Sequence, residues 1–542
     1  MRSPWRRAFS LRLLDADGRL IVPWGWALVG LLITAAAVAY DLTDAPSPNW
    51  RSQGAARAAA AHLLAQLPDR PALDPELPVA FVSDRYGDAY ANRLVSGKRG
   101  VPLPDALPIW SWRVPLRGGQ GYVAVNAVTD AVTGLDLPQA REMPALAGVA
   151  ALDAAQGLAR RVGVGGPGWE GPVVQPGSRG DVYTWRSQGN ALGEAPEVAE
   201  ITVQGGRPVQ LRRYLAVPDS FKRELDVQEQ RGSWLARGVL GWVELLAALS
   251  AAILAFVYRR RAHWGFGYGV AAVFLVLAVL SGLNSSLVSQ MLQTPRLAPG
   301  AVAIGTLALV VIGQSVHTLW LLFGGAAGWA MAQAEWGDRV ALLAGGVRRL
   351  LGREGAVAGL RAYGLFVVHY QLAFWFYYFA EKRLGVWEAT GLAFQQRFNL
   401  VLPALYPLQV AILAPLMEEV LWRLFAISAL RRLFRLTFPA VLLPAALWGL
   451  AHSWYQVYPP YTRAIELTLV GLLLGYALVY WGLEVSIGSH LLYNALVTCV
   501  GLATVPLAGH RAGALLAGAL LLLPAVPVAL QLWRQRREAP AG

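Results

Sequence analysis

Long apolar runs recur along this chain and restrict the folds that it can adopt. A bilayer core is about 30 Å thick, so a helix of about 20 apolar residues crosses it. Hydrophobic residues make up 55% of the 542 residues, and the mean hydropathy is +0.41. The sequence therefore predicts an all-α polytopic membrane helix bundle with about ten transmembrane helices. We predict the spans at residues 21–41, 235–257, 266–290, 299–332, 362–380, 398–424, 438–455, 464–483, 485–506 and 511–533.

The segment between the first two spans, residues 44–232, has a different composition. Pro, Gly, Asp and Arg are frequent in it, and no window is long and apolar enough to cross a membrane. Residues 55–67 and 146–162 have helical patterns, and alternating β-branched and aromatic residues between and after them are typical of strands. We predict an inserted soluble α+β domain, and the repeated order of helix and strands suggests a duplicated unit.

The basic residues set the predicted orientation of the chain. Lys and Arg number 47 against 34 Asp and Glu, and the arginines gather at the ends of apolar runs. The positive-inside rule explains this distribution better than nucleic-acid binding does. Residues 258–264, 339–361, 431–435 and the basic tail then all fall on the cytoplasmic side. Both termini are predicted to be cytoplasmic, and residues 44–232 are predicted to lie outside.

The composition also indicates the compartment. Arginine with abundant Ala, Gly, Pro and Trp is typical of a GC-rich bacterial genome, so we expect a multi-pass protein of a bacterial inner membrane. The first apolar run has no clear cleavage site and is predicted to be retained as a helix. Cys499 is the single cysteine, which excludes a disulfide framework and a cysteine-rich metal site.

Four regions follow from this organisation. They are the cytoplasmic N-terminus with the first helix (1–43), the extracytoplasmic domain (44–232), helices two to four with a cytoplasmic loop (233–357) and the remaining membrane helices (358–542).

Three charged residues interrupt the apolar segment "LAPLMEEVLWRLFAI" at residues 413–427. A charge at mid-membrane costs from about 2.5 to over 10 kcal/mol, so such residues usually face the protein interior and have a function. Glu419 and Arg423 are four residues apart on a helix and are predicted to form an ion pair. Glu418 points about 100° away from that pair. We therefore expect Glu419 to be structural and Glu418 to be free for chemistry.

Two later spans supply further polar side chains. His452 lies in "ALWGLAHSW", and His490 with Asn494 lies in "GSHLLYNAL". His490 and Asn494 are four residues apart, so they project from one helix face and can grip one ligand or one developing charge. Counting residues from the helix ends places His490 and Asn494 nearer the cytoplasm than Glu418, which predicts a cavity open to the cytoplasm.

The order EEVLWR, WGLAH, HLLYN resembles the EExxxR, FxxxH and HxxxN/D motifs of the CAAX protease and bacteriocin-processing (CPBP) family of intramembrane proteases. This family includes type II CAAX prenyl endopeptidases and lysostaphin-resistance protein A-like proteins. The resemblance covers about residues 398–510. Trp448 stands where the family commonly has Phe, and we expect little consequence because an aromatic wall is kept.

The resemblance implies an endopeptidase that acts on membrane-associated or C-terminal peptides, with residues 358–542 as its catalytic membrane domain. Glu418 would activate a water with help from His452, while His490 and Asn494 would support the oxyanion. Glu419 and Arg423 belong to the same motif. If a metal such as zinc is present, Glu418, His452 and His490 would be its ligands. A metal-free glutamate mechanism would use the same residues, and the sequence leaves both open.

Two other classes of function would also place polar residues in membrane helices. A non-proteolytic sensor or immunity protein would use the external domain to bind a ligand of unknown kind, but intact motifs weigh against it. A transporter would show an internal repeat of its spans, and none is obvious. His369, His317 and Glu244 also lie in apolar spans, and we expect packing roles for them. The predicted partners are a peptide or membrane-protein substrate and the lipid bilayer, with no nucleic acid.

Overall fold

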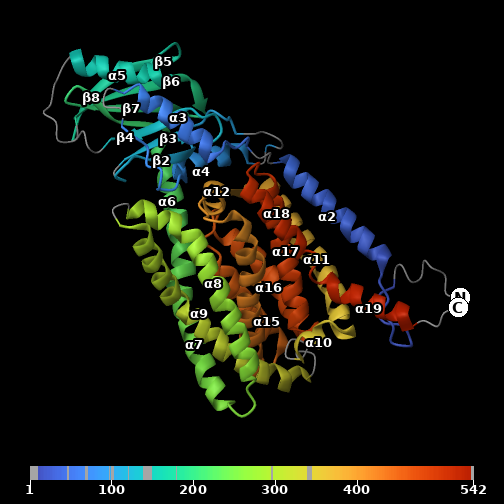
Figure 1. Ribbon diagram of the computed structural model, residues 1–542. Helices are drawn as coiled ribbons and strands as arrows, with labels where there is room; N and C mark the ends of the chain where they lie inside the picture. Colours follow the sequence, from blue (N-terminus) through green and yellow to red (C-terminus); the bar gives the residue numbers. More distant parts are fainter. Residues whose placement is uncertain are drawn as a thin grey trace.

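The computed structural model has a β-rich domain at one end of a long helical bundle (Figure 1). Three predictions fall partly outside the described residues, namely the arginines within residues 1–9, the start of the helix predicted at 146–162, and part of the basic segment 339–361. The structure describes residues 10–44, 48–67, 71–96, 98, 103–119, 121–137, 149–178, 180–294, 297–337 and 345–538.

The β-domain is built on one eight-stranded antiparallel sheet with the order β1-β2-β3-β4-β8-β7-β6-β5. Each half of the sheet has four strands that pair in chain order, and β4 joins the halves by pairing with β8, with Leu135 opposite Leu211. The strands are β1 Ala80–Ser83, β2 Trp110–Pro115, β3 Tyr122–Asn126, β4 Val132–Asp136, β5 Trp169–Gly177, β6 Gly180–Leu192, β7 Ala195–Gln204 and β8 Arg207–Leu215.

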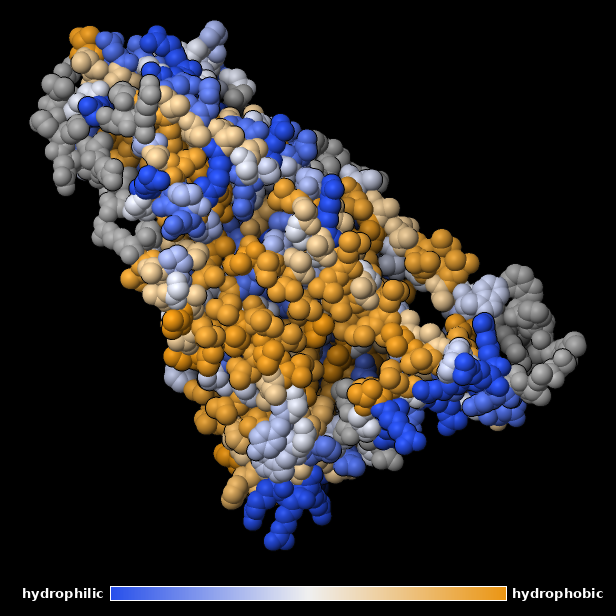
Figure 2. Space-filling view, in the orientation of Figure 1, coloured by the Kyte–Doolittle hydropathy of each residue, from blue (hydrophilic) through white to orange (hydrophobic). Residues whose placement is uncertain are grey.

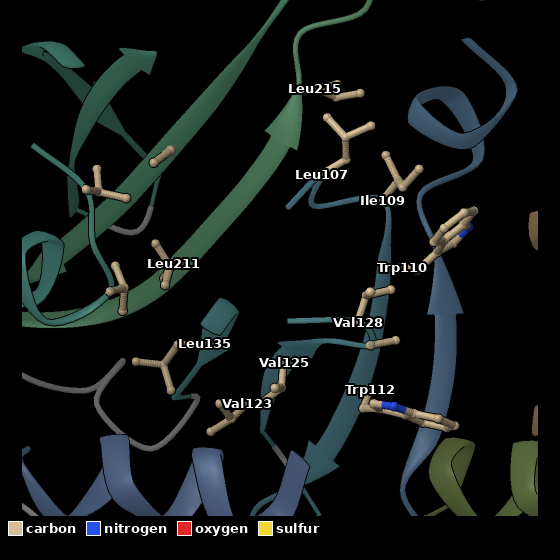
Figure 3. Packing of buried hydrophobic residues seen from close by; sticks show 14 of the residues in the cluster. Leu107, Ile109, Trp110, Trp112, Val123, Val125, Val128, Leu135, Leu211 and Leu215 are labelled. Carbon is tan, nitrogen blue, oxygen red and sulfur yellow. The ribbon is translucent and has the colours of Figure 1, made fainter. Parts of the chain in front are cut away.

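One helix precedes the strands of each half and packs on them. Helix α3 (Gln53–Ala65) contacts β2 and β3, and α5 (Val149–Arg161) contacts β7 and β8. The core between the layers consists of buried aromatic and aliphatic side chains (Figure 3). Trp112 is fully buried, and its indole N–H donates to the Arg51 carbonyl at 3.1 Å. This pairing satisfies the polar atom of one of the largest core residues.

A single helical run leads from the sheet into the bundle. It comprises α6 Asp219–Ser233, the π-helix η2 Trp234–Val239 and α7 Leu240–Val257. Together they form a candidate span of 39 residues. Its first part is rich in charged residues and its last part is apolar. The domain is therefore joined to the bundle by a continuous helix.

The rest of the bundle consists of helices. Within the described residues, six helices are long and apolar enough to cross a membrane, or up to eight if each of two bent helix pairs is one span. The predicted number of ten is not confirmed. The further helices are α2 Trp24–Asp44, α8 Trp264–Gln293, α9 Pro299–Trp336, α10 Gly346–Leu350, α11 Arg353–Leu384, α12 Gly391–Phe398, α13 Ala414–Glu418, α14 Ser428–Phe434, α15 Thr437–Ala451, α16 Tyr461–Trp481, α17 Leu483–Ala503, α18 Ala508–Leu520 and α19 Ala525–Glu538, with η5 Pro403–Leu405, η6 Leu408–Leu413 and η7 Glu419–Ile427.

Three predicted spans differ from the observed helices. The span predicted at 511–533 is divided into α18 and α19, which meet at 47°. The segment predicted as one span at 398–424 is broken, because α12 and the helical run Pro403–Phe434 meet at 111°. The free backbone groups at the break are bound by Asn284 of α8, whose side chain accepts from the Leu402 N–H at 2.6 Å and donates to the Leu402 carbonyl at 3.1 Å. The predicted span 438–455 is a helix of only 15 residues, α15.

The surface of the bundle is apolar around its middle and hydrophilic at the end away from the β-domain (Figure 2). Ile253, Phe256 and Ile312 are among the exposed apolar side chains. The α7–α8 hairpin carries the three arginines of the segment 258–264. This distribution is the one expected of helices in contact with lipid.

The β-domain is docked on the two ends of helix α12. Asp88 of α4 (Arg85–Val95) is 2% exposed and accepts from the Gly391 N–H and the Trp110 indole N–H, both at 2.8 Å. The Asn399 side chain pairs with both backbone polar groups of Phe81, at 2.7 and 2.9 Å. Burial raises the pKa of Asp88 above its ordinary value, although these two hydrogen bonds lower it. The domain and the bundle are thus joined by buried polar contacts.

Candidate active site

The helix that carries the paired glutamates changes its geometry between them. Glu418 ends the α-helix α13, and Glu419 begins the π-helix η7. A π-helix widens the turn, and such segments are frequent at functional sites. The two carboxylates consequently face different surroundings although they are neighbours in the sequence.

Glu419 is fully buried and has three polar partners. Its carboxylate lies 3.4 Å from Arg423 Nε, which is the ion pair expected from the spacing. It is also 2.9 Å from His490 Nδ1 of α17 and accepts a short hydrogen bond from the Ser486 hydroxyl. A buried charge needs such compensation, so the surroundings of Glu419 suit a permanent structural anion.

Arg423 is almost as buried as its partner, with 1% of its surface exposed. Its guanidinium lies over the Trp448 ring, 4.0 Å from the ring centroid. The two terminal nitrogens, Nη1 and Nη2, have no hydrogen-bond partner within the described part of the chain. Cation–π attraction, which is stronger when desolvated, together with the Glu419 carboxylate holds this charge in place.

Glu418 has the accessible carboxylate of the pair, with 12% of its side chain exposed. Its Oε2 accepts a hydrogen bond from the Trp448 indole N–H at 2.7 Å. Its Oε1 lies 3.9 Å from Nε2 of His452, the residue that follows α15. That separation is too long for a hydrogen bond and is suited to a bridging water.

The ring of His452 is oriented by a backbone contact. Its Nδ1 lies 2.8 Å from the Trp448 carbonyl oxygen. A carbonyl only accepts, so Nδ1 carries the proton and Nε2 of the neutral ring keeps a lone pair. This lone pair is on the nitrogen nearest to Glu418. His452 and Glu418 therefore present two acceptors to one small space.

His490 and Asn494 come from the same helix face, as their spacing predicted. In the structure each also has a partner within the protein. His490 Nδ1 contacts Glu419, and the Asn494 amide donates to the Val410 carbonyl at 2.8 Å. The His490 ring centroid lies 5.9 Å from that of Trp448. The three motifs thus meet around the Trp448 side chain, which contacts Glu418, Arg423 and His490.

The suggested zinc ligands were tested on the geometry of their donor atoms. Among the described residues, no group of three or more His, Cys, Asp or Glu side chains is arranged to hold a metal ion. The Nδ1 atom of His490 faces Glu419, whereas the Nε2 atom of His452 faces Glu418, so the two imidazoles contact different carboxylates. Glu418, His452 and His490 therefore do not fit a tetrahedral site as they are placed, and we derive no step through a metal.

Some contacts of the site were missed by the sequence reasoning. Ser486 binds Glu419 and lies four residues before His490, so the spacing of the two could have indicated it. Trp448 was expected to be only an aromatic wall but is a hydrogen-bond donor to Glu418. His369 of α11 is buried, stacks on Tyr493 at 4.3 Å and has its ring centroid 6.3 Å from that of His490.

The β-domain lies close to the segment that follows His452. Ser453, which follows His452, packs with its carbonyl oxygen against Gly232 of α6, where a Cβ atom would have no room. Five residues further on, the Tyr458 hydroxyl donates to Glu229 of α6 at 2.8 Å. His452 is therefore at the end of the bundle that adjoins the β-domain, and the opening of the cavity to the cytoplasm stays a prediction.

Comparison with known families adds to this geometry. Residues 400–496 match the family model described as type II CAAX prenyl endopeptidase Rce1-like. These residues form an Rce1-like domain. No curated protein and no solved structure matches the chain.

The Rce1-like domain contains all three motifs and the partners that bind them. It begins at the break before η5 and ends within α17. Ser486 and Trp448 lie inside it, whereas His369, Glu244 and the β-domain lie outside it. The family of this domain is that of CAAX-type intramembrane proteases, as the resemblance implied.

Proposed function

We propose that this protein is an intramembrane endopeptidase in which Glu418 activates a water molecule with the help of His452. The observation that carries the proposal is the 3.9 Å separation of Glu418 Oε1 and His452 Nε2, two acceptors that can hold one water between them. Glu418 is the general base, because it is the accessible carboxylate of the pair.

The reaction is hydrolysis of a peptide bond. Glu418 takes a proton from the water as the water oxygen attacks the carbonyl carbon, which gives a tetrahedral intermediate with a negative oxygen. His490 and the second amide hydrogen of Asn494 stabilise that oxygen. When the C–N bond breaks, the proton held by Glu418 passes to the leaving nitrogen. The products are a new carboxylic acid and a new amine.

Glu419 and Arg423 have a supporting role in this scheme. In this scheme the His490 ring carries both protons, so that Nδ1–H pairs with Glu419 and Nε2–H donates to the intermediate. Arg423 balances the charge of Glu419 and supports the Trp448 ring. Their removal would misplace His490 and Trp448 without taking away the base.

The substrate is a membrane-associated peptide or the C-terminal part of a membrane protein. The arginines at one end of the bundle and the position of the β-domain at the other support a bacterial inner membrane protein with both termini in the cytoplasm. Residues 44–232 would then lie outside. The excess of basic residues is accounted for by this orientation, so no nucleic-acid partner is proposed.

A peptide library provides the test. Purified full-length protein is incubated with the library, and the products are identified by mass spectrometry in water enriched in oxygen-18. We expect new carboxyl groups that carry one heavy oxygen, and none with the Glu418→Ala or His452→Ala variant. Cleavage that persists in both variants would overturn the proposal.

A further inference from the structure

An open cavity of about 520 Å³ lies at the junction of the β-domain and the bundle. The cavity is wide open, so a ligand in it would stay partly in contact with solvent. One wall belongs to α4 of the β-domain, and the other to the helical run of α6 and η2. The lining residues are Arg85, Asp226, Glu229, Gln230, Ser233 and Trp234.

The cavity is connected to the candidate active site through its helical wall. Gly232 lies between two lining residues and packs against the Ser453 carbonyl oxygen, next to His452. Glu229 accepts the hydrogen bond from Tyr458, and Arg237 lies over the Trp454 ring at 5.5 Å. A ligand in the cavity would therefore lie beside the segment 453–458, which follows His452.

The candidate site has two accessible side chains. Glu418 and His452 keep 12% and 16% of their side chains exposed, whereas Glu419 and Arg423 keep 0% and 1%. His452 is at the end of the bundle that adjoins the cavity.

The charges of the cavity favour a cationic ligand. Arg85 donates to Glu229 at 2.9 Å and to Asp226 at 2.6 Å, so its charge is already engaged by two carboxylates. One negative charge remains among the three side chains. An anion would have to displace a carboxylate from Arg85, whereas a cation adds to the existing network. Trp234 is 64% exposed and offers an aromatic face to the same cation.

We propose that this cavity binds a lysine or arginine side chain in the part of the substrate that flanks the cleavage site on the extracytoplasmic side. The proposal rests on the proposed protease function and adds to it the substrate class, a peptide with a basic residue outside the apolar segment. The β-domain then takes part in substrate selection through Arg85 of α4.

The binding test uses the full-length protein in nanodiscs with the Glu418→Ala substitution, so that bound peptide is not cut. Three labelled peptides share one apolar segment and differ in the flank, which holds lysines, alanines or glutamates. Fluorescence anisotropy should give a dissociation constant about tenfold lower for the lysine peptide than for the alanine peptide, and no gain for the glutamate peptide. Equal binding of all three would overturn the inference.

Variants then locate the effect in the cavity. Glu229→Gln keeps an acceptor for Tyr458 but removes the charge, so binding of the lysine peptide should weaken by about tenfold. Asp226→Asn should weaken it similarly. The matched control is Glu224→Gln on the same helix, whose carboxylate pairs with Arg93 and does not line the cavity. The inference is overturned if the control weakens binding as much as Glu229→Gln does.

Cleavage by the unsubstituted protein separates the two proposals. If the protein binds the lysine peptide selectively but cuts no peptide, the result contradicts the protease function and supports the cation site. If it cuts the lysine and alanine peptides with equal KM, the result supports the protease function and contradicts the cation site. Selective cleavage with a lower KM for the lysine peptide supports both.

Discussion

The Trp448 indole N–H donates to Glu418 Oε2 at 2.7 Å, and the same ring lies over the Arg423 guanidinium. One side chain thus contacts the candidate base through its edge and the structural cation through its face. The related motif commonly has Phe here, which supplies a face but no donor. The tryptophan consequently ties the position of Glu418 to the Glu419–Arg423 ion pair.

Replacing Trp448 by Phe should lower the rate while leaving the fold in place. Phe keeps the aromatic face for Arg423 but removes the hydrogen bond to a carboxylate, which is worth about 1.5–3 kcal/mol. We expect kcat for peptide cleavage to fall by roughly tenfold or more. The control is Trp454→Phe in the loop after His452, which should stay within about twofold. An unchanged kcat in Trp448→Phe would contradict a positioning role for the indole.

Glu419→Gln should mainly reduce stability, since it leaves the buried Arg423 charge without its carboxylate. Breaking a buried ion pair from one side costs about 3–5 kcal/mol. The control is Glu335→Gln, because Glu335 pairs with Arg432 at 3.7 Å where both side chains are partly exposed. That change should lower the free energy of unfolding by less than about 1 kcal/mol. Unfolding in nanodiscs followed by tryptophan fluorescence measures both, and equal losses would show that the Glu419 pair is not structural.

The sequence predicted the contacts that depend on local geometry. The Glu419–Arg423 pair follows from a spacing of four residues, and the helices α8 and α17 follow from apolar runs at 266–290 and 485–506. The hydrogen bond from Trp448 to Glu418 joins residues 30 apart, and that from Ser486 to Glu419 joins residues 67 apart. Such contacts are fixed by how helices pack, and hydropathy holds no information about them.

The same limit applies to the span count and to the position of the site. The break after α12 depends on Asn284, which is 118 residues from Leu402 in the sequence. An apolar pattern continues across this break, so periodicity alone could not locate it. Counting residues along single helices gives the depth of each side chain in the bundle. The neighbourhood of the site and the β-domain depends instead on the packing of α6 against Ser453.

Asp88 should make the stability of the protein depend on pH. Burial raises its pKa in the folded state, so its contribution is fully present below the ordinary pKa of about 4 and is lost as the pH rises through the raised value. Asp88→Asn lowers Tm at every pH, because an amide cannot fully replace the acceptors for Gly391 and Trp110. Above about pH 4 the Tm of the unsubstituted protein should fall relative to the variant. Parallel Tm curves would contradict this role.

Chelators should leave cleavage unchanged. The candidate ligands Glu418, His452 and His490 are not grouped for a metal in the structure, and the proposed base needs only a water. After incubation with 1,10-phenanthroline and removal of the chelator, we expect the rate to stay within about twofold of the untreated sample. Loss of activity that added zinc restores would show that these three residues move together to bind a metal.

The central claim is that Glu418 and His452 act on the same water molecule. The most direct measurement is kcat for one cleaved peptide with Glu418→Gln, His452→Gln and the control Glu335→Gln, which changes a partly exposed glutamate of α9. We predict losses of about a thousandfold or more for the first two variants, and a change within about twofold for Glu335→Gln. Activity that survives in Glu418→Gln or His452→Gln, or an equal loss in Glu335→Gln, would contradict the claim.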